Sequence, residues 1–365
     1  MAISIDEPQP VLKKAGDIEY FPSGRQTYLA PLPLPTEAEP CCPYISDYND
    51  TYLDFGGGEP NVYSYQIWVG GPFSATCFFA FGSPLLFWIM GLMEGYSFAE
   101  SWEFAVDFFY AVWGYALFMW LSGSAMCLYV WLEAHKLFTS VIPTRFNRQR
   151  REVCFMPDGA TEPLFIPWES LSAWIVQGQS ASQYGVTRHY GMGMGFEHEG
   201  EWVRVEFQCG ALQLAIANWE AVRGYMEYEL NDLSAIQDPL ELHEPGDPSH
   251  EGLYTFRNAR AGLHRRIREK EVGWIYGFFW YVYHVMTLWT LPNHLVEWEI
   301  KRIAKVGRKA LPQVMREWSE PLPPAQWAKP SDELLRLSAK VKALIKRSPR
   351  KPITEVFAEA YRSDK

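Results

Sequence analysis

Two long stretches of the chain carry no charged side chain, and each predicts an apolar helix. The first runs from residue 70 to 93 (GGPFSATCFFAFGSPLLFWIMGLM) and the second from 108 to 132 (FFYAVWGYALFMWLSGSAMCLYVWL). About 20 apolar residues cross a hydrocarbon core of roughly 30 Å, so each stretch is long enough to span a bilayer. The pattern therefore predicts an apolar helical hairpin at 70–142, and we expect it to be a transmembrane pair.

The charges that flank these stretches predict the orientation of the hairpin. The connection holds only acids, which are Glu94, Glu100, Glu103 and Asp107. The second stretch is followed by a basic region that includes Lys136, Arg145 and Arg148. Because Lys and Arg favour the cytoplasmic side, both ends of the hairpin are predicted to lie in the cytoplasm. The alternative is a buried helical pair in a soluble cytoplasmic protein.

From residue 143 to 252 the texture changes to short strand-like runs separated by turns. Residues 201–208 (EWVRVEFQ) alternate apolar and polar positions, as a half-buried strand does, and the glycines of GMGMG (191–195) and HEGE (198–201) predict reversals. Residues 211–229 follow with an apolar stripe at helical spacing. The expected class is α+β, with a small antiparallel, pleckstrin-homology-like β domain closed by one helix.

The two ends of the chain complete the predicted organisation. Residues 1–69 are rich in Pro, Tyr and acids without sustained periodicity, which predicts an extended arm. Residues 253–365 predict further helices that pack back on the hairpin. Within them, the aromatic stretch 273–292 is expected to pack on the hairpin or lie at the membrane interface. Ser331 is expected to cap a helix.

The composition indicates the cellular compartment of the protein and argues against a disulfide-rich scaffold. Hydrophobic residues make up 48% of the chain and the net charge is −10, with the basic excess concentrated after residue 300. The 6 cysteines show neither CxxC spacing nor the density of a disulfide scaffold, which indicates a reducing compartment. The N-terminus lacks the pattern of a secretory signal, so we expect the chain to start in the cytoplasm, with the hairpin in the bacterial inner membrane and the polar domain in the cytoplasm.

Motifs of catalysis are missing from the sequence. HExxH, GxSxG, a Walker A loop and a dinucleotide fingerprint do not occur, and the histidines do not recur at metal-ligand spacing. GMGMG lacks the following Lys and helix of a phosphate loop. We therefore expect no enzyme, no catalytic residues, no cofactor, no metal and no small-molecule substrate. Direct nucleic-acid binding is disfavoured by the acidic surroundings.

Two groups of residues remain as candidate binding sites. The basic run at 144–152 is expected to bind lipid headgroups and to signal topology, through Arg145, Arg148, Arg150 and Arg151. Structural ion pairs within the β domain are the alternative for these arginines. The stretch 225–252 is acidic without a base and predicts a docking edge for a basic protein, the alternative being a solvated loop. Its candidate partner-binding residues are Glu227, Glu229, Asp232, Asp238, Glu241, Glu244, Asp247 and Glu251.

Three motifs carry a resemblance to a known family. PTRFNRQRREVCF at 143–155, IPWESLSAW at 166–174 and PLPPAQWAKPSDELL at 321–335 resemble an uncharacterised bacterial family encoded beside type VI secretion effectors. The resemblance implies an immunity protein that binds and neutralises a co-encoded antibacterial toxin. The chain is similar to the partner of a nuclease effector with a restriction-endonuclease-like domain. The implied partner is that cognate effector toxin, and no catalytic residue is implied. The alternative is a membrane-anchored, pleckstrin-like lipid- or protein-binding module.

Overall fold

The structure is a computed structural model, and it divides the chain into two compact units of mixed α and β structure. The first unit contains residues 1–57, 142–239 and 311–365, and the second contains 58–141 and 240–310. The residues that the structure describes are 13–56, 59–157, 159–183, 185–233, 236, 242–244, 246–248, 250–306 and 309–362. The α+β class is therefore confirmed, although the units do not follow the predicted domain boundaries.

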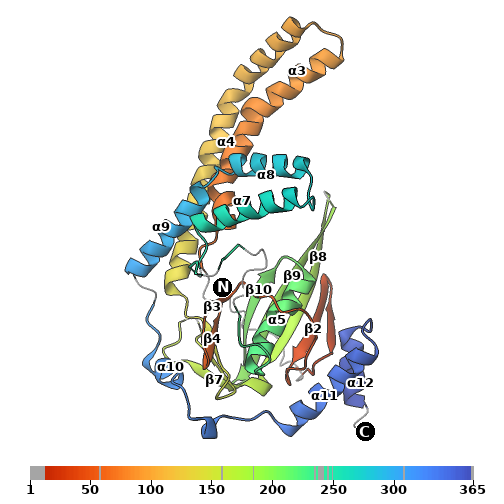
Figure 1. Cartoon of the computed structure of the whole chain (residues 1–365), viewed down its shortest axis with the longest axis vertical. Helices are drawn as coiled ribbons and strands as arrows, with labels where there is room; N and C mark the ends of the chain where they lie inside the picture. Colours follow the sequence, from red (N-terminus) through yellow and green to blue (C-terminus); the bar gives the residue numbers. More distant parts are fainter. Residues whose placement is uncertain are drawn as a thin grey trace. The chain divides into compact units, whose positions relative to one another are not determined.

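Two five-stranded antiparallel sheets form the first unit (Figure 1). One has the strand order β1-β2-β8-β9-β10 and the other β3-β4-β5-β6-β7. The strands are β1 (Ile18–Phe21), β2 (Gly24–Ala30), β3 (Ile45–Tyr48), β4 (Tyr52–Phe55), β5 (Thr144–Asn147), β6 (Glu152–Phe155), β7 (Leu164–Pro167), β8 (Ser172–Ser182), β9 (Gly185–His198) and β10 (Glu201–Cys209). A short 3₁₀ turn, η3 (Trp168–Ser170), precedes β8.

The N-terminal segment belongs to both sheets, which corrects the prediction of an extended arm at 1–69. β2 pairs with β8, and β4 pairs with β5. Leu29 and Leu53 are fully buried as a result. These strands are only four to seven residues long, so they show too few positions for a period of two to be recognised. β8 and β5, the strands that join β2 and β4 to the sheets, lie far away in the sequence.

The helix predicted after the strands is confirmed as α5 (Leu212–Met226), which packs on β8, β9 and β10. Its apolar stripe buries Trp219, Val222 and Met226 completely. Trp219 stacks on Trp168 with ring centroids 5.3 Å apart. These rings belong to the hydrophobic core of the unit.

The GMGMG segment is the middle of β9, so the prediction of a tight hairpin there is wrong. The reversal lies instead at Glu199–Gly200, where both residues have positive φ, as HEGE predicted. Trp174 is paired with Gly193 across β8 and β9. Its ring covers the strand so closely that a Cβ at Gly193 would lie 2.3 Å from ring atoms. The glycines thus make room for a buried tryptophan and have no turn to form.

Replacing Gly193 by Ala should destabilise the protein by about 1–3 kcal/mol, because the added methyl group overpacks a position fixed by backbone and a ring. Gly210→Ala is the matched control, since a Cβ there meets nothing within 4 Å. Urea denaturation of the full chain measures the difference. Equal midpoints for the two variants would contradict this account of the glycine-rich strand.

The last helices of the chain belong to the sheet unit, which corrects the expectation that all of 253–365 packs on the hairpin. They are α10 (Gln313–Trp318), the 3₁₀ turn η4 (Pro324–Gln326), α11 (Asp332–Arg347) and α12 (Ile353–Arg362). Leu337 of α11 and Phe357 of α12 are fully buried in the core that also contains Leu29. Ser331 caps α11 as predicted, and its side chain accepts a hydrogen bond from the backbone N–H of Leu334 at 3.1 Å.

The second unit contains the predicted helical hairpin. One helical rod runs over α1 (Val62–Tyr65), η1 (Gln66–Gly70), α2 (Gly71–Cys77), η2 (Phe78–Gly82) and α3 (Ser83–Met93), and the other is α4 (Phe98–Ser140). The wider π-helical segments η1 and η2 each precede a proline, Pro72 or Pro84. A proline has no backbone N–H to donate, so it breaks the regular ladder at these points.

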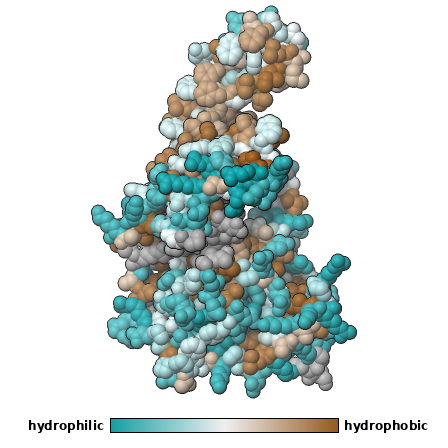
Figure 2. Space-filling model, in the orientation of Figure 1, coloured by the Kyte–Doolittle hydropathy of each residue, from teal (hydrophilic) through white to brown (hydrophobic). Residues whose placement is uncertain are grey.

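Both rods are long and apolar enough to cross a membrane by length and composition. Only 17% of the most apolar 18-residue stretch within residues 62–93 is buried, and only 11% of the corresponding stretch within 98–140. The core helix of a soluble protein is mostly buried, whereas most of each apolar stretch is exposed within this unit. Figure 2 shows hydrophobic side chains along α3 and α4.

Three more helices complete this unit: α7 (Leu253–Arg268), α8 (Trp274–Met286) and α9 (Leu291–Val306). α8 has 13 residues and is about 20 Å long, which is short of a bilayer core. It packs on the first rod, as predicted for the aromatic stretch. The Ser74 hydroxyl donates to the carbonyl of Met286 at 2.7 Å, and the Tyr283 hydroxyl donates to Gln66 at 2.8 Å.

Candidate functional site

The arginines predicted to bind lipid headgroups lie inside the first unit. Arg145, Arg148 and Arg151 are buried, and Arg150 is half-buried. The Arg145 guanidinium donates two hydrogen bonds of 2.6 Å to the Asp54 carboxylate and one of 2.8 Å to the Ser319 hydroxyl. Its plane also stacks on the ring of Tyr52 at 3.7 Å.

The other arginines of the run are also bound within the unit. Arg151 donates to both carboxylate oxygens of Glu227, at 2.8 and 3.1 Å, and to Glu169 at 3.1 Å. Arg150 donates to the carbonyl of Trp318 at 2.8 Å. The lipid-headgroup prediction is therefore wrong for Arg145, Arg148 and Arg151, which are buried and bound to carboxylates. The alternative of structural pairs accounts for them.

The acidic stretch 225–252 belongs to both units, because the division between them falls after residue 239. Glu227 and Glu229 lie just after the end of α5 and form ion pairs within the first unit. Glu227 also accepts from the indole N–H of Trp168 at 2.8 Å. Burial alone would raise the pKa of Glu229, but hydrogen bonds from Arg223 and Lys342 bring that pKa below its usual value. These two carboxylates stabilise the fold and are unsuited to docking.

The remaining acids of the stretch are divided between the units. Asp232 is exposed on the first unit. Glu244 is exposed and Asp247 and Glu251 are half-buried on the second, where Asp247 accepts from the Asn258 side chain at 2.8 Å. Glu251 accepts from the backbone N–H of Val62. Asp238 and Glu241 lie outside the described residues. Asp232 is thus the clearest remaining docking candidate on the β unit.

Asp232 lies beside the β3–β4 turn, which the sequence did not single out. Asp232 acts on the pKa of Tyr48, which is raised chiefly by burial and also by this negative charge. β3 adds the exposed Asp47, which accepts from the Tyr52 hydroxyl at 3.1 Å, and the turn adds Asp50, whose side chain is 98% exposed. Asp50 also accepts from Arg148 at 3.0 Å. We call Asp47, Asp50 and Asp232 the acidic turn.

A column of stacked side chains borders the acidic turn. The Arg148 guanidinium lies 4.6 Å from the ring centroids of both Tyr225 and Tyr228. Tyr228 stacks in turn on Trp327, with centroids 5.5 Å apart and planes 13° apart. Tyr228 and Trp327 are 37% and 36% exposed. Rigid Tyr, Trp and Arg side chains are the types enriched in the centres of protein interfaces.

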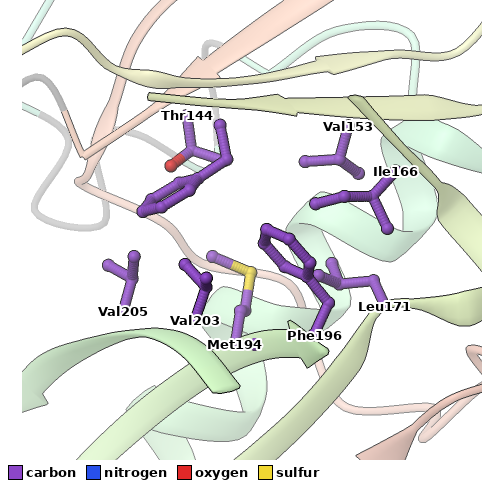
Figure 3. A pocket seen from close by; sticks show the side chains of 10 residues that line it. Thr144, Val153, Ile166, Leu171, Met194, Phe196, Val203 and Val205 are labelled. Atoms are coloured by element: carbon purple, nitrogen blue, oxygen red, sulfur yellow. The ribbon is translucent and has the colours of Figure 1, made fainter. Parts of the chain in front are cut away.

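An apolar pocket lies between the two sheets of the first unit. Its lining side chains converge from both sheets (Figure 3) and include Thr144, Val153, Phe155, Ile166, Leu171, Met194, Phe196, Val203 and Val205. Apart from the Thr144 hydroxyl the lining is apolar, and it offers no carboxylate or imidazole as a general base.

The second unit contains a buried polar cluster around Glu299 that the sequence analysis missed. The Tyr65 hydroxyl donates to Glu299 Oε2. The indole N–H of Trp131 donates to that oxygen at 3.3 Å and to the Tyr65 hydroxyl at 2.9 Å. His135 Nδ1 lies 2.9 Å from Glu299 Oε1. A Glu among apolar helical positions, with His and Trp near the end of the second rod, was the available signal.

Burial raises the pKa of the Glu299 carboxyl to about 7, against a smaller lowering by Arg302. A protonated carboxyl fits the contacts. Its Oε1–H can donate to His135, while Oε2 accepts from Tyr65 and Trp131. The cluster fastens α9 to both rods of the hairpin.

Among the described residues, no three His, Cys, Asp or Glu side chains come together so that they could hold a metal ion. His284, the histidine of the aromatic stretch, donates its Nδ1–H to the Trp280 carbonyl at 2.8 Å. No family model, curated protein or solved structure matches the chain.

Proposed function

We propose that the protein is an immunity protein, held in the bacterial inner membrane by its hairpin, that binds and neutralises a co-encoded type VI secretion toxin. Binding, and not catalysis, is its activity. The observation that carries this proposal is the exposed acidic turn with its aromatic border. A basic nuclease surface is the complementary partner, and the family resemblance of 143–155, 166–174 and 321–335 supports a toxin.

The same observation gives the position of the contact. Trp327 lies within the third resembling motif and stands beside the acidic turn through its stacking on Tyr228. An aromatic anchor with charged neighbours combines short-range packing with long-range attraction, so the surface suits a tight and fast-forming complex. We propose that the toxin is a nuclease whose phosphate-binding groups face these carboxylates.

The alternative is a pleckstrin-like module that binds lipid or protein and is unrelated to toxins. It assumes the same fold. We propose a pleckstrin-like arrangement for β5 to β10 closed by α5, three strands in each sheet followed by one helix. Its lipid-binding form has less support, because the arginines that would have held headgroups are bound to carboxylates.

Reversing Asp47, Asp50 and Asp232 to Lys should slow association with the product of the adjacent gene by about tenfold or more at low salt, because steering depends on the summed charge of a patch. Protection of cells that express the toxin should fall in parallel. The control reverses Glu197, Glu201 and Glu206, which are exposed on β9 and β10 and change the net charge equally.

Stopped-flow association, salt dependence and survival on co-expression measure these effects, and melting shows that both variants fold. A folded acidic-turn variant that binds at the parental rate would exclude this surface. Failure of the parent to bind the adjacent gene product would overturn the toxin proposal itself.

A further inference from the structure

α7 and α8 form a helical pair in which α7 is basic and α8 has an exposed apolar face. Neither the sequence motifs nor the hairpin explains this arrangement. α8 packs on α7 through Gly277, Trp280, Tyr281 and His284, which face Ile267, Phe256 and His264. Its opposite face carries large apolar side chains that are 39–63% exposed: Ile275, Phe278, Phe279, Val282 and Val285. Trp274, at the start of α8, is 75% exposed.

α7 and the turn after it are strongly basic. The exposed bases are Arg257, Arg260, Arg265, Arg266, Arg268 and Lys270. Two acids, Glu269 and Glu271, lie in the same segment, and Glu271 is 3.4 Å from Arg266. Figure 2 shows hydrophilic side chains gathered over α7. A basic helix thus adjoins a helix with an exposed aromatic face.

The attachment of α8 to the hairpin fixes its level along the proposed membrane span. Both rods are free of charged side chains from the level at which Phe87 stacks on Phe108, which follows Asp107. Counted from Phe87, about 20 helical residues cover a hydrocarbon core of roughly 30 Å and end beside Gln66. Gln66 is the residue whose side chain accepts from the Tyr283 hydroxyl of α8 at 2.8 Å. Within this unit, α7 and α8 run side by side across the direction of α3 and α4 (Figure 1). α8 therefore meets the hairpin where the core would end.

We propose that the α7–α8 pair is an interfacial element that binds anionic phospholipid. The exposed apolar face of α8 lies in the acyl–headgroup boundary, and the bases of α7 and its C-terminal turn contact the phosphates of the cytoplasmic leaflet. Aromatic side chains favour this boundary, and each base near an anionic surface contributes about 1 kcal/mol. The inference rests on the proposed membrane anchor, and it moves the lipid contact from 145–151 to 257–270.

The test uses the full chain purified in a neutral detergent and titrated with phosphatidylglycerol or phosphatidylcholine, with bound lipid counted by native mass spectrometry. The parent should bind phosphatidylglycerol about tenfold more tightly than phosphatidylcholine. Changing Arg265, Arg266 and Arg268 to Glu should abolish that preference, and changing them to Lys should retain it. The matched control changes Lys346, Arg347 and Arg350, exposed on and after α11, to Glu and should keep the preference.

Equal binding of the two lipids by the parent, or an unchanged preference in the α7 Glu variant, would overturn the inference. Loss of preference in the α11 control as well would show a dependence on net charge alone and would overturn it too. Alkaline carbonate washing of cell membranes tests the anchor separately. Recovery of the parent in the supernatant would refute the hairpin anchor. Protection against the toxin, scored in the variant with Arg265, Arg266 and Arg268 changed to Glu, tests the immunity proposal.

Discussion

Replacing Arg145 by Ala should destabilise the first unit by about 3–5 kcal/mol, the usual consequence of breaking a buried ion pair on one side only. Arg145 and Asp54 have side chains that are 5% and 6% exposed, and their contact is bidentate. The substitution leaves the Asp54 carboxylate without its partner. Because whole domains are stable by only about 5–15 kcal/mol, the variant should be largely unfolded at modest denaturant concentrations.

Two further variants separate the charge from the packing. Arg188→Ala removes an exposed arginine of β9 and should change stability by no more than about 0.5 kcal/mol. The double change Arg145→Met with Asp54→Leu should recover most of the lost stability, since an apolar pair replaces both charges together. Urea denaturation followed by far-UV circular dichroism measures all three. Parental stability of the single variant would show that Arg145 is not structurally required and would reopen its assignment to lipid.

Arg145 also shows why the run 144–152 was misread from the sequence. A cluster of bases after an apolar helix is typical of a juxtamembrane anchor, and nothing local distinguishes it from a buried network. The distinguishing partners, Asp54 and Ser319, lie far away on both sides in the sequence. Local charge patterns predict where charges occur, whereas burial depends on pairing that only the tertiary fold brings about.

Patterns that are local and long were predicted well. The charge-free rods, the alternation of β10 and the stripe of α5 each contain enough residues for their period to be read. The four-residue strands β3 and β4 do not, and they form because β5 offers a paired edge. Gly193 was misassigned for a related reason. Its role depends on Trp174, in the strand opposite.

The candidate docking surface could likewise be predicted only where its residues are close together in the sequence. Asp232 could be named from the acidic composition of its stretch, but the acidic turn also needs Asp47 and Asp50, which reach it through the fold. The aromatic border needs Trp327, which joins Tyr228 from near the end of the chain. Composition therefore located one part of the surface and could not assemble it.

Raising the pH from 5.5 to 8 should destabilise the second unit through Glu299, and Glu299→Gln should remove most of that dependence. The folded pKa of Glu299 is raised to about 7 by burial, against an ordinary value of 4.5. Below 4.5 both folded and unfolded states hold the proton. Between the two values only the unfolded state ionises, so the stabilisation is lost as the pH rises and is gone above about 7.

The magnitude follows from the size of the shift and the completeness of the burial. Each pKa unit corresponds to about 1.4 kcal/mol, so the total contribution is at most about 3 kcal/mol. The Glu299 side chain is 0% exposed, so bulk water does not screen it. A glutamine cannot ionise, yet its carbonyl can still accept from Tyr65 and Trp131, and its amide can donate to His135. The substitution should therefore flatten the pH profile without removing the contacts that join α9 to the hairpin.

Thermal melting of the detergent-solubilised full chain, followed by hydrogen exchange in α9, measures the effect, with Glu269→Gln as the control for an exposed acid of the same unit. The parent and Glu269→Gln should lose stability between pH 5.5 and 8 to the same extent, and Glu299→Gln should lose less by about 2 kcal/mol. Parallel profiles for the parent and Glu299→Gln would mean that the carboxyl is ionised in the folded state throughout this range. His135 would then be its counter-ion, and the cluster would be an ion pair at the base of the hairpin.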